Sequence, residues 1–282
     1  MREESVHGRG WGPFAAAMAL VAAFGWPAGF EAAAPQQAEP AAGSPRATAP
    51  IDVTGYWVSV VNEDWRYRMV TPQKGDYESV PLNEEGRLVA DSWDLAADNA
   101  NGNQCKAFGV GNIMRQPGRL HITWQDDRTL QIETDAGTQT RLLHFDRSMT
   151  ASGPRTWQGH SVAEWEGPAV TGGGRGGRGR GRGGPPPEGG SLHVVTTNAR
   201  AGYLRSNGVP YSENATVTEY FERLPTQANG DDWLMVITTV EDPQYLQDPF
   251  LTSTHFKREP DGSKWNPTPC GTDPPGVPTL NR

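Results

Sequence analysis

Long apolar runs, cysteines and metal-binding motifs are all scarce in this chain of 282 residues. Beyond residue 34, no segment approaches the run of about 20 apolar residues that a transmembrane helix needs, so we expect no membrane span. The histidines form neither an H-x-H nor an H-E-x-x-H pair, so no local metal site is written in the sequence. We therefore expect no metal or other cofactor, although ligands from separate strands could still converge.

An excess of positive charge is missing as well. The formal net charge is −8, and it becomes −7 without residues 1–34, which contain two arginines and three glutamates. A mildly acidic surface favours solubility and argues against a general affinity for nucleic acids or anionic lipids. We therefore expect no specific nucleic-acid partner.

Residues 1–34 have the pattern of a secretory signal peptide. Arg2 and Arg9 precede an apolar run at residues 14–26, and small residues follow it. This pattern predicts export to the periplasm or the extracellular space. Residues 35–50 are rich in proline and alanine and have too little apolar surface to offset the entropy of ordering, which predicts a disordered tether.

Residues 51–270 are long enough for one domain, and their pattern is that of an all-β fold. Apolar and polar residues alternate with a period of two in segments separated by turn residues, as in antiparallel sheets. The expected strands are 53–61, 119–124, 128–134, 138–145, 160–166, 191–198, 215–224, 232–241 and 250–258. They predict an antiparallel barrel or a sandwich. Only residues 84–100 have the spacing of a short helix, and residues 271–282 are expected to form a flexible tail.

A glycine- and arginine-rich run at residues 171–190 separates two of the expected strands, 160–166 and 191–198. A hairpin can carry such an insertion, because lengthening a turn from four to about twenty residues costs only about 1.4 kcal/mol of closure entropy. The alternative is an Arg-Gly box that stacks on bases and pairs with phosphates. Four arginines without interleaved aromatic residues, in a net acidic chain, favour the solvated loop.

The start of the first expected strand, "GYW" at Gly55 to Trp57, resembles the G-x-W motif of the lipocalins and wider calycins. This resemblance implies a calycin-like barrel in which Trp57 plugs one end and an arginine from a late strand covers the indole. Arg258 is at the position that would take this part. Ordinary core packing of an aromatic strand is the alternative interpretation.

Over a longer stretch, the chain resembles a family of uncharacterised exported bacterial proteins with the same order of segments between Val53 and Arg258. The segments are "GYW", "PGRLHITW", "WQGHSVAEWEG", "LHVVTTN", "SENATVTEYFER" and "VEDPQYLQDPF". The resemblance implies export and a β-rich fold and transfers no mechanism. Relatives of this kind pass from "WEG" to the next strand through a short turn, which supports an insertion at residues 171–190.

Aromatic residues indicate where a ligand could bind. Trp124 lies close in sequence to His121, and Trp157 and Trp165 lie close to His160 and Glu164. Large aromatic rings with polar neighbours can line a pocket for an apolar ligand or stack on a sugar ring, and they can equally fill a barrel. The candidate ligand-binding set is Trp124, Trp157, His160, Glu164 and Trp165, with a small molecule or a glycan as the partner.

No catalytic motif accompanies this set, so the sequence leaves open whether the protein is an enzyme. "GHSVA" at residues 159–163 lacks the final glycine and the following helix of a nucleophile elbow. Glu164 and Glu166 share one strand face, and Asp126 and Asp127 share a turn; such carboxylate pairs can hydrolyse glycosides at a suitable separation. The leading interpretation is non-catalytic ligand binding, with a glycan-directed hydrolase or an envelope protein-interaction module as alternatives.

The two cysteines, Cys105 and Cys270, predict one disulfide. An even number of cysteines in an exported chain favours pairing, and two isolated thiolates lack the spacing of a zinc site. Cys270 lies in a proline-rich segment that has few apolar residues of its own. The bond would therefore staple this segment to the body of the protein.

Overall fold

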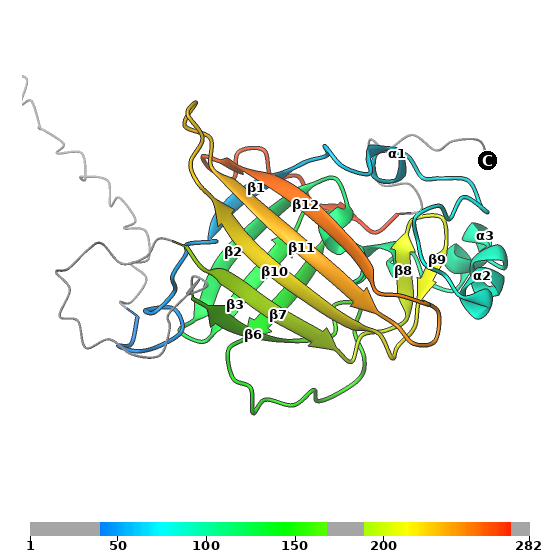
Figure 1. Ribbon diagram of the computed structural model, residues 1–282, viewed down its shortest axis with the longest axis horizontal. Coiled ribbons are helices and arrows are strands. Elements are labelled where there is room, and N and C mark those ends of the chain that lie inside the picture. Colours follow the sequence, from blue (N-terminus) through cyan, green and yellow to red (C-terminus); the bar gives the residue numbers. More distant parts are fainter. Residues whose placement is uncertain (1–39, 168–188, 272–282) are drawn as a thin grey trace, which may run out of the picture. The chain divides into compact units, whose positions relative to one another are not determined.

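The computed structural model describes residues 40–167 and 189–271 (Figure 1). The expected signal peptide, nearly all of the glycine- and arginine-rich run, and the expected tail after residue 271 lie outside these residues. No helix in the described part of the chain is long and apolar enough to cross a membrane.

Nine strands close into a β-barrel (Figure 1). They are β1 (Gly55–Val60), β2 (Arg119–Asp126), β3 (Thr129–Thr134), β5 (Gln139–His144), β6 (His160–Glu166), β7 (Ser191–Thr197), β10 (Thr216–Leu224), β11 (Trp233–Glu241) and β12 (Phe250–Glu259). Their order around the barrel is β1-β12-β11-β10-β7-β6-β5-β3-β2. All nine expected strands are present, and the fold is the barrel rather than the sandwich.

Neighbouring barrel strands are antiparallel except β5 and β6, which pair in parallel. Residues 145–159 form the long connection between them, because a parallel pair cannot be joined by a tight turn. The next two strands, β6 and β7, pair as antiparallel neighbours, with Glu166 opposite Ser191. The glycine- and arginine-rich run therefore connects two paired strands of the barrel.

Alternate side chains of each strand fill the barrel, because successive residues of a strand point to opposite faces. One apolar cluster inside it contains the fully buried Trp57, Phe221, Leu234 and Phe256. The Trp57 indole also donates a 2.9 Å hydrogen bond to the carbonyl of Val53. Around Trp57 the interior of the barrel is therefore filled by side chains.

Two arginines from late strands lie over the Trp57 ring. The guanidinium carbon of Arg258 on β12 is 5.5 Å from the ring centroid, and that of Arg223 on β10 is 5.1 Å away. The arginine expected beside the G-x-W start is thus close to the indole, and a second arginine shares this position. A cation over an indole adds electrostatic attraction to the burial of the ring.

A polar layer crosses the barrel between this cluster and a second apolar cluster. Arg141 and Glu219 are fully buried and form two hydrogen bonds, of 3.2 and 2.6 Å. Arg141 also donates to Thr196 Oγ1 at 3.3 Å. On β10, Glu219 lies between Val217, which belongs to the second cluster, and Phe221, which belongs to the first.

The second apolar cluster joins the barrel to the helix α2 (Glu84–Asp91) and to a small hairpin of β8 (Gly202–Arg205) and β9 (Val209–Tyr211) (Figure 1). The chain also forms the short helices α1 (Trp65–Arg68) and α3 (Leu95–Ala100) and the 3-10 turns η1 (Lys106–Phe108) and η2 (Ile113–Arg115). The helix expected over residues 84–100 is therefore two helices. Asp94 separates them, because it has an extended backbone and its carboxylate accepts from the amides of Ala96 and Ala97 at the start of α3.

Cys105 and Cys270 form the expected disulfide, with sulfurs 2.02 Å apart and Cα atoms 5.1 Å apart. The segment before Cys270 also pairs with the body, because β13 (Thr268–Pro269) runs parallel to β4 (Ala136–Gly137). The bond therefore staples the proline-rich segment to the rest of the protein, as the sequence predicts.

Residues 40–50, part of the expected tether, lie against the barrel. The Trp165 indole donates to Pro45 O at 2.8 Å. The amides of Ala41 and Arg46 donate to Asp127, in the turn between β2 and β3. The prediction of a disordered tether is wrong for these residues, because the barrel supplies hydrogen-bond partners that the composition of the segment alone does not reveal.

Candidate functional site

An open groove of about 570 Å³ lies on the outside of the barrel at the turn between β10 and β11. Its lining includes one indole, three carboxamides, one carboxylate and one imidazole. These belong to Trp233, Asn62, Gln227, Asn229, Asp231 and His255. An aromatic ring beside several hydrogen-bonding groups suits a sugar or another polar ring as ligand.

Strand alternation turns the indole of this groove outward. The residue after Trp233 on β11, Leu234, is fully buried inside the barrel, so Trp233 lies on the outer face. His255 reaches the same face from β12, where its neighbour Phe256 points inward. The two strands form the floor of the groove, and the turn at residues 225–232 forms a wall.

The wall is held in place by its own hydrogen bonds. Asp231 Oδ2 accepts from Asn229 Nδ2 at 2.9 Å, and Asp231 Oδ1 accepts from Lys257 Nζ at 2.7 Å. The amide of Gln227 closes the turn by donating to Asp231 O at 2.9 Å. Side chains that are fixed before a ligand arrives lose less entropy when it binds.

The carboxylate of the groove is suited to accepting hydrogen bonds rather than to acid catalysis. The hydrogen bond from Lys257 lowers the pKa of Asp231, so the group is ionised at neutral pH. Asp231 is also the only carboxylate among the described residues that line the groove. Most glycoside hydrolases use two carboxyl groups that flank the scissile bond.

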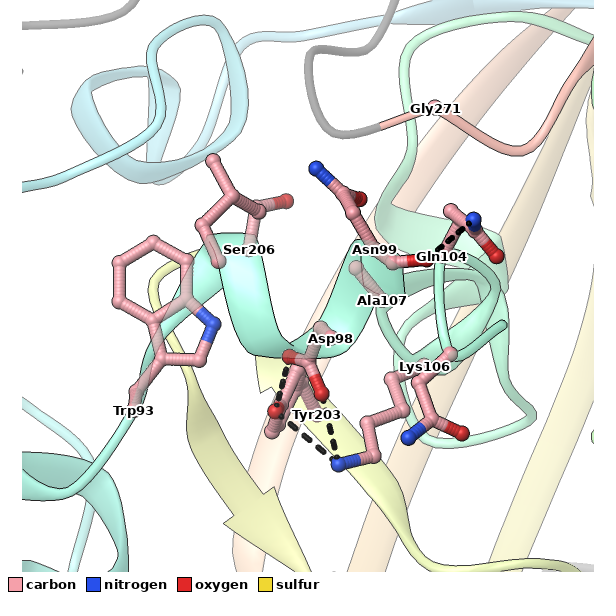
Figure 2. A pocket seen from close by; sticks show the side chains of 11 residues that line it. Trp93, Asp98, Asn99, Gln104, Lys106, Ala107, Tyr203, Ser206 and Gly271 are labelled. Atoms are coloured by element: carbon pink, nitrogen blue, oxygen red, sulfur yellow. Dashed lines mark hydrogen bonds and ion pairs between the residues drawn. The ribbon is translucent and has the colours of Figure 1, made fainter. Parts of the chain in front are cut away.

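A second, smaller pocket lies between α3, η1 and β8, and Figure 2 shows its lining. Asp98 accepts from the Tyr203 hydroxyl at 2.5 Å and from Lys106 Nζ at 2.9 Å. Burial raises the pKa of Tyr203, and the hydrogen bond to Asp98 raises it further, so the phenol stays protonated. The space of about 20 Å³ holds little more than one water molecule. These contacts therefore fix α3 to β8 and leave no room for a substrate.

The residues expected to bind a ligand do not form one site. Trp124 and Trp165 pack against the apolar cluster inside the barrel, with ring centroids 6.4 Å apart. Phe145 completes this aromatic group, at 5.5 Å from Trp124 and 5.3 Å from Trp165. His160 and Glu164 alternate with Trp165 along β6, so they lie on the outside of the barrel.

Trp157 lies apart from both groups. The guanidinium carbon of Arg200 is 3.8 Å from the centroid of its indole. The expected set is thus divided, and the rings of Trp124 and Trp165 pack with Phe145. The cause is simple: neighbours in a strand sequence face opposite sides of the sheet, so proximity along the chain is not proximity in a site.

On the outside of β6 and β7, Glu164, Glu166 and His193 come together. His193 Nδ1 is 3.1 Å from a Glu164 oxygen and 3.5 Å from a Glu166 oxygen. One oxygen or nitrogen of each side chain lies within 4.8 Å of the others, so these residues could hold a divalent cation. Glu164 also pairs with Arg147. The sequence pattern paired the two glutamates and missed the histidine, because His193 comes from the neighbouring strand.

The groove around Trp233 is also missing from the sequence-based prediction. Its residues come from position 62, from the turn after β10 and from β12, and only folding brings them together. One signal was present: Trp233 alternates with the apolar residues Leu234 and Val236, which places the indole on the outer face of its strand.

Comparison with known proteins gives no relative whose function could be compared with this site, so the site is interpreted from its geometry. No protein-family model, curated protein or solved structure matches the chain. The resemblances to calycins and to uncharacterised exported proteins therefore stay predictions.

Proposed function

We propose that this protein is an exported, non-catalytic binding protein that takes a saccharide in the groove around Trp233. The observation that carries this proposal is an outward indole flanked by carboxamides and one ionised carboxylate in an open groove. A sugar ring stacks its C–H face on an indole, and its hydroxyls pair with amide and carboxylate groups. The open shape suits an extended glycan chain.

Export is supported by two features. The basic residues and apolar run at the start of the sequence are typical of a secretory signal peptide. The Cys105–Cys270 disulfide is a bond that persists in oxidising compartments. The periplasm or the extracellular space is therefore the compartment that we propose.

The two alternatives have less support. Asp126 and Asp127 accept hydrogen bonds from backbone amides near the β2–β3 turn, and Glu164 pairs with Arg147, so the carboxylates considered for hydrolysis have structural partners. An interaction module that presents sheet edges is disfavoured, because a closed barrel removes the long edges that pair with a partner strand.

The test is to titrate the purified, disulfide-bonded protein with cello-, chito-, laminari- and xylo-oligosaccharides, using calorimetry and tryptophan fluorescence. Trp233→Ala should weaken binding about fivefold or more, because an aromatic contact contributes about 0.5–1.5 kcal/mol beyond area burial. Trp65→Ala is the matched control, because Trp65 is exposed and does not line the groove. Equal affinity of Trp233→Ala and the parent would reject the site, and release of reducing ends would identify hydrolysis instead.

A further inference from the structure

Three arginines from distant segments are buried close together outside the groove. They are Arg68 on α1, Arg115 on η2 and Arg205 on β8, and only 5%, 3% and 1% of their surfaces are exposed. The positive charge of Arg115 repels both Arg68 and Arg205 and contributes to lowering the pKa of each. Arginine is rarely buried unless its N–H groups are paired with acceptors. The hydrogen-bond partners of these three side chains therefore show whether the cluster is complete without a ligand.

The first of the three has a partner at every guanidinium nitrogen. Arg68 Nε donates to Arg115 O at 2.9 Å, Nη1 to Glu63 Oε1 at 2.7 Å, and Nη2 to Ser59 Oγ at 3.0 Å. Arg115 is only partly paired. Its Nη2 donates to Asp64 Oδ2 at 3.0 Å, whereas its buried Nη1 has no partner among the described residues.

Arg205 has no hydrogen-bond partner at any of its three guanidinium nitrogens within residues 40–167 and 189–271. Its guanidinium carbon lies 3.7 Å from the centroid of the Tyr67 ring. The ring attracts the charge through its face, but the N–H groups point outward in the guanidinium plane and stay unpaired. In the same described part, Thr71 Oγ1 and Asn207 Oδ1, from the segments that carry Tyr67 and Arg205, are also buried without a partner.

The cluster has one positive charge in excess. Within the described part of the chain, its three guanidinium groups form ion pairs with two carboxylates, those of Glu63 and Asp64. The nearby Asp76 accepts a 2.8 Å hydrogen bond from the exposed Arg66. Burial, and then repulsion by Arg115, lowers the pKa of Arg205 to about 10, so this side chain is still charged at neutral pH. A buried charge without a counter-charge or hydrogen bonds strongly destabilises a fold.

We propose that Arg115 and Arg205 bind a small oxyanion, namely a phosphate, sulfate or carboxylate group, between the α1 segment and the β8–β9 hairpin. The planar fork of N–H donors in arginine matches two oxygens of such a group. The anion would cancel the excess charge and pair with the N–H groups that have no protein partner. Asp64, whose side chain is 38% exposed, marks the side on which the cluster meets solvent.

This site is distinct from the saccharide groove. Glu63 is the contact between the two, since it accepts from Arg68 and its other oxygen lies 3.4 Å from Nδ1 of the groove residue His255. Anion binding should therefore be intact in Trp233→Ala, so that failure of one proposal can be told from failure of the other.

The experiment is thermal unfolding of the full, disulfide-bonded protein in sodium phosphate, sulfate, acetate or chloride at equal ionic strength, with affinities from calorimetry. We expect the midpoint temperature to rise and saturate with at least one oxyanion and not with chloride. The three oxyanions distinguish a phosphate, sulfate or carboxylate ligand. Arg205→Met should raise the midpoint in chloride, because it removes an unpaired charge, and should weaken anion binding about tenfold or more.

Arg87→Met is the matched control, because Arg87 is an exposed arginine on helix α2, and it should respond to the oxyanions as the parent does. Identical unfolding of the parent in all four salts would overturn the proposal and show that water satisfies these arginines. An undiminished response of Arg205→Met would overturn it as well. If that variant does not fold, ³¹P line broadening of phosphate by the parent decides: broadening that excess sulfate removes supports the site, and its absence rejects it.

Discussion

Removing one member of the buried Arg141–Glu219 pair should destabilise the barrel far more than removing both. Each side chain is fully buried in the polar layer, and the two share hydrogen bonds of 3.2 and 2.6 Å. Thr196 accepts a third bond from Arg141 and is itself hydrogen-bonded to Ser161 at 2.7 Å. A variant that lacks one partner therefore leaves a charge in a place that water does not reach.

The magnitude follows from this burial. Arg141→Met or Glu219→Leu alone should lower the free energy of unfolding by about 3–5 kcal/mol, because the remaining charge is uncompensated. The double variant should lie within about 2 kcal/mol of the parent, because a buried ion pair that is replaced by apolar residues of similar volume is often neutral or stabilising. Arg141 Nε is buried with no partner in the described part of the chain, which adds a cost that the double variant removes.

The assay is urea unfolding of the disulfide-bonded protein, followed by tryptophan fluorescence for the parent, both single variants and the double variant. The sum of the two single losses should exceed the loss in the double variant by about 3 kcal/mol or more. Additive losses, or single variants that each cost less than about 1 kcal/mol, would refute a coupled pair that is shielded from solvent.

Three further predictions concern other parts of the protein. Trp57→Ala should cost about 3–5 kcal/mol in urea unfolding, through lost burial and a cavity, and a loss below about 1 kcal/mol would contradict its full burial in the core of the barrel. The double variant Cys105→Ser with Cys270→Ser should be less stable by up to about 5 kcal/mol, the entropy ceiling for a bond that spans 165 positions, and a non-reducing peptide map of the parent should link the two segments. Burial, and next His160, lowers the pKa of His144; the unfolded chain therefore binds this proton more tightly, so stability should fall as pH drops below the ordinary pKa of 6.5. His160→Ala should raise the pKa of His144 measured by NMR, and an unchanged value would reject that coupling.

Where the sequence patterns failed, the failures have physical causes. The pair β8 and β9 was not expected, because its strands are very short and its register is irregular between Tyr203 and Arg205. The single helix over residues 84–100 is divided because Asp94 caps a new helix. Residues 40–50 are held by partners from the barrel rather than by their own composition.

The predicted ligand-binding set was divided for a different reason. Trp124 and Trp165 fill the interior, whereas His160 and Glu164 lie outside, and a strand pattern alone does not show which face will meet a ligand. The groove around Trp233 and the arginine cluster around Arg205 each combine residues from several distant segments. Neither has a local signature in the chain.

The amino-acid sequence by itself determined all nine barrel strands and the disulfide between Cys105 and Cys270. The strands could be predicted because alternation of period two is a property of a few consecutive residues. The disulfide could be predicted because two cysteines allow only one intramolecular pair. Tertiary structure alone decided that the sheet closes and which side chains meet across it. Closure depends on the register and twist of strands far apart in the chain, and the residues beside Trp233, Glu219 and Arg205 come from distant segments.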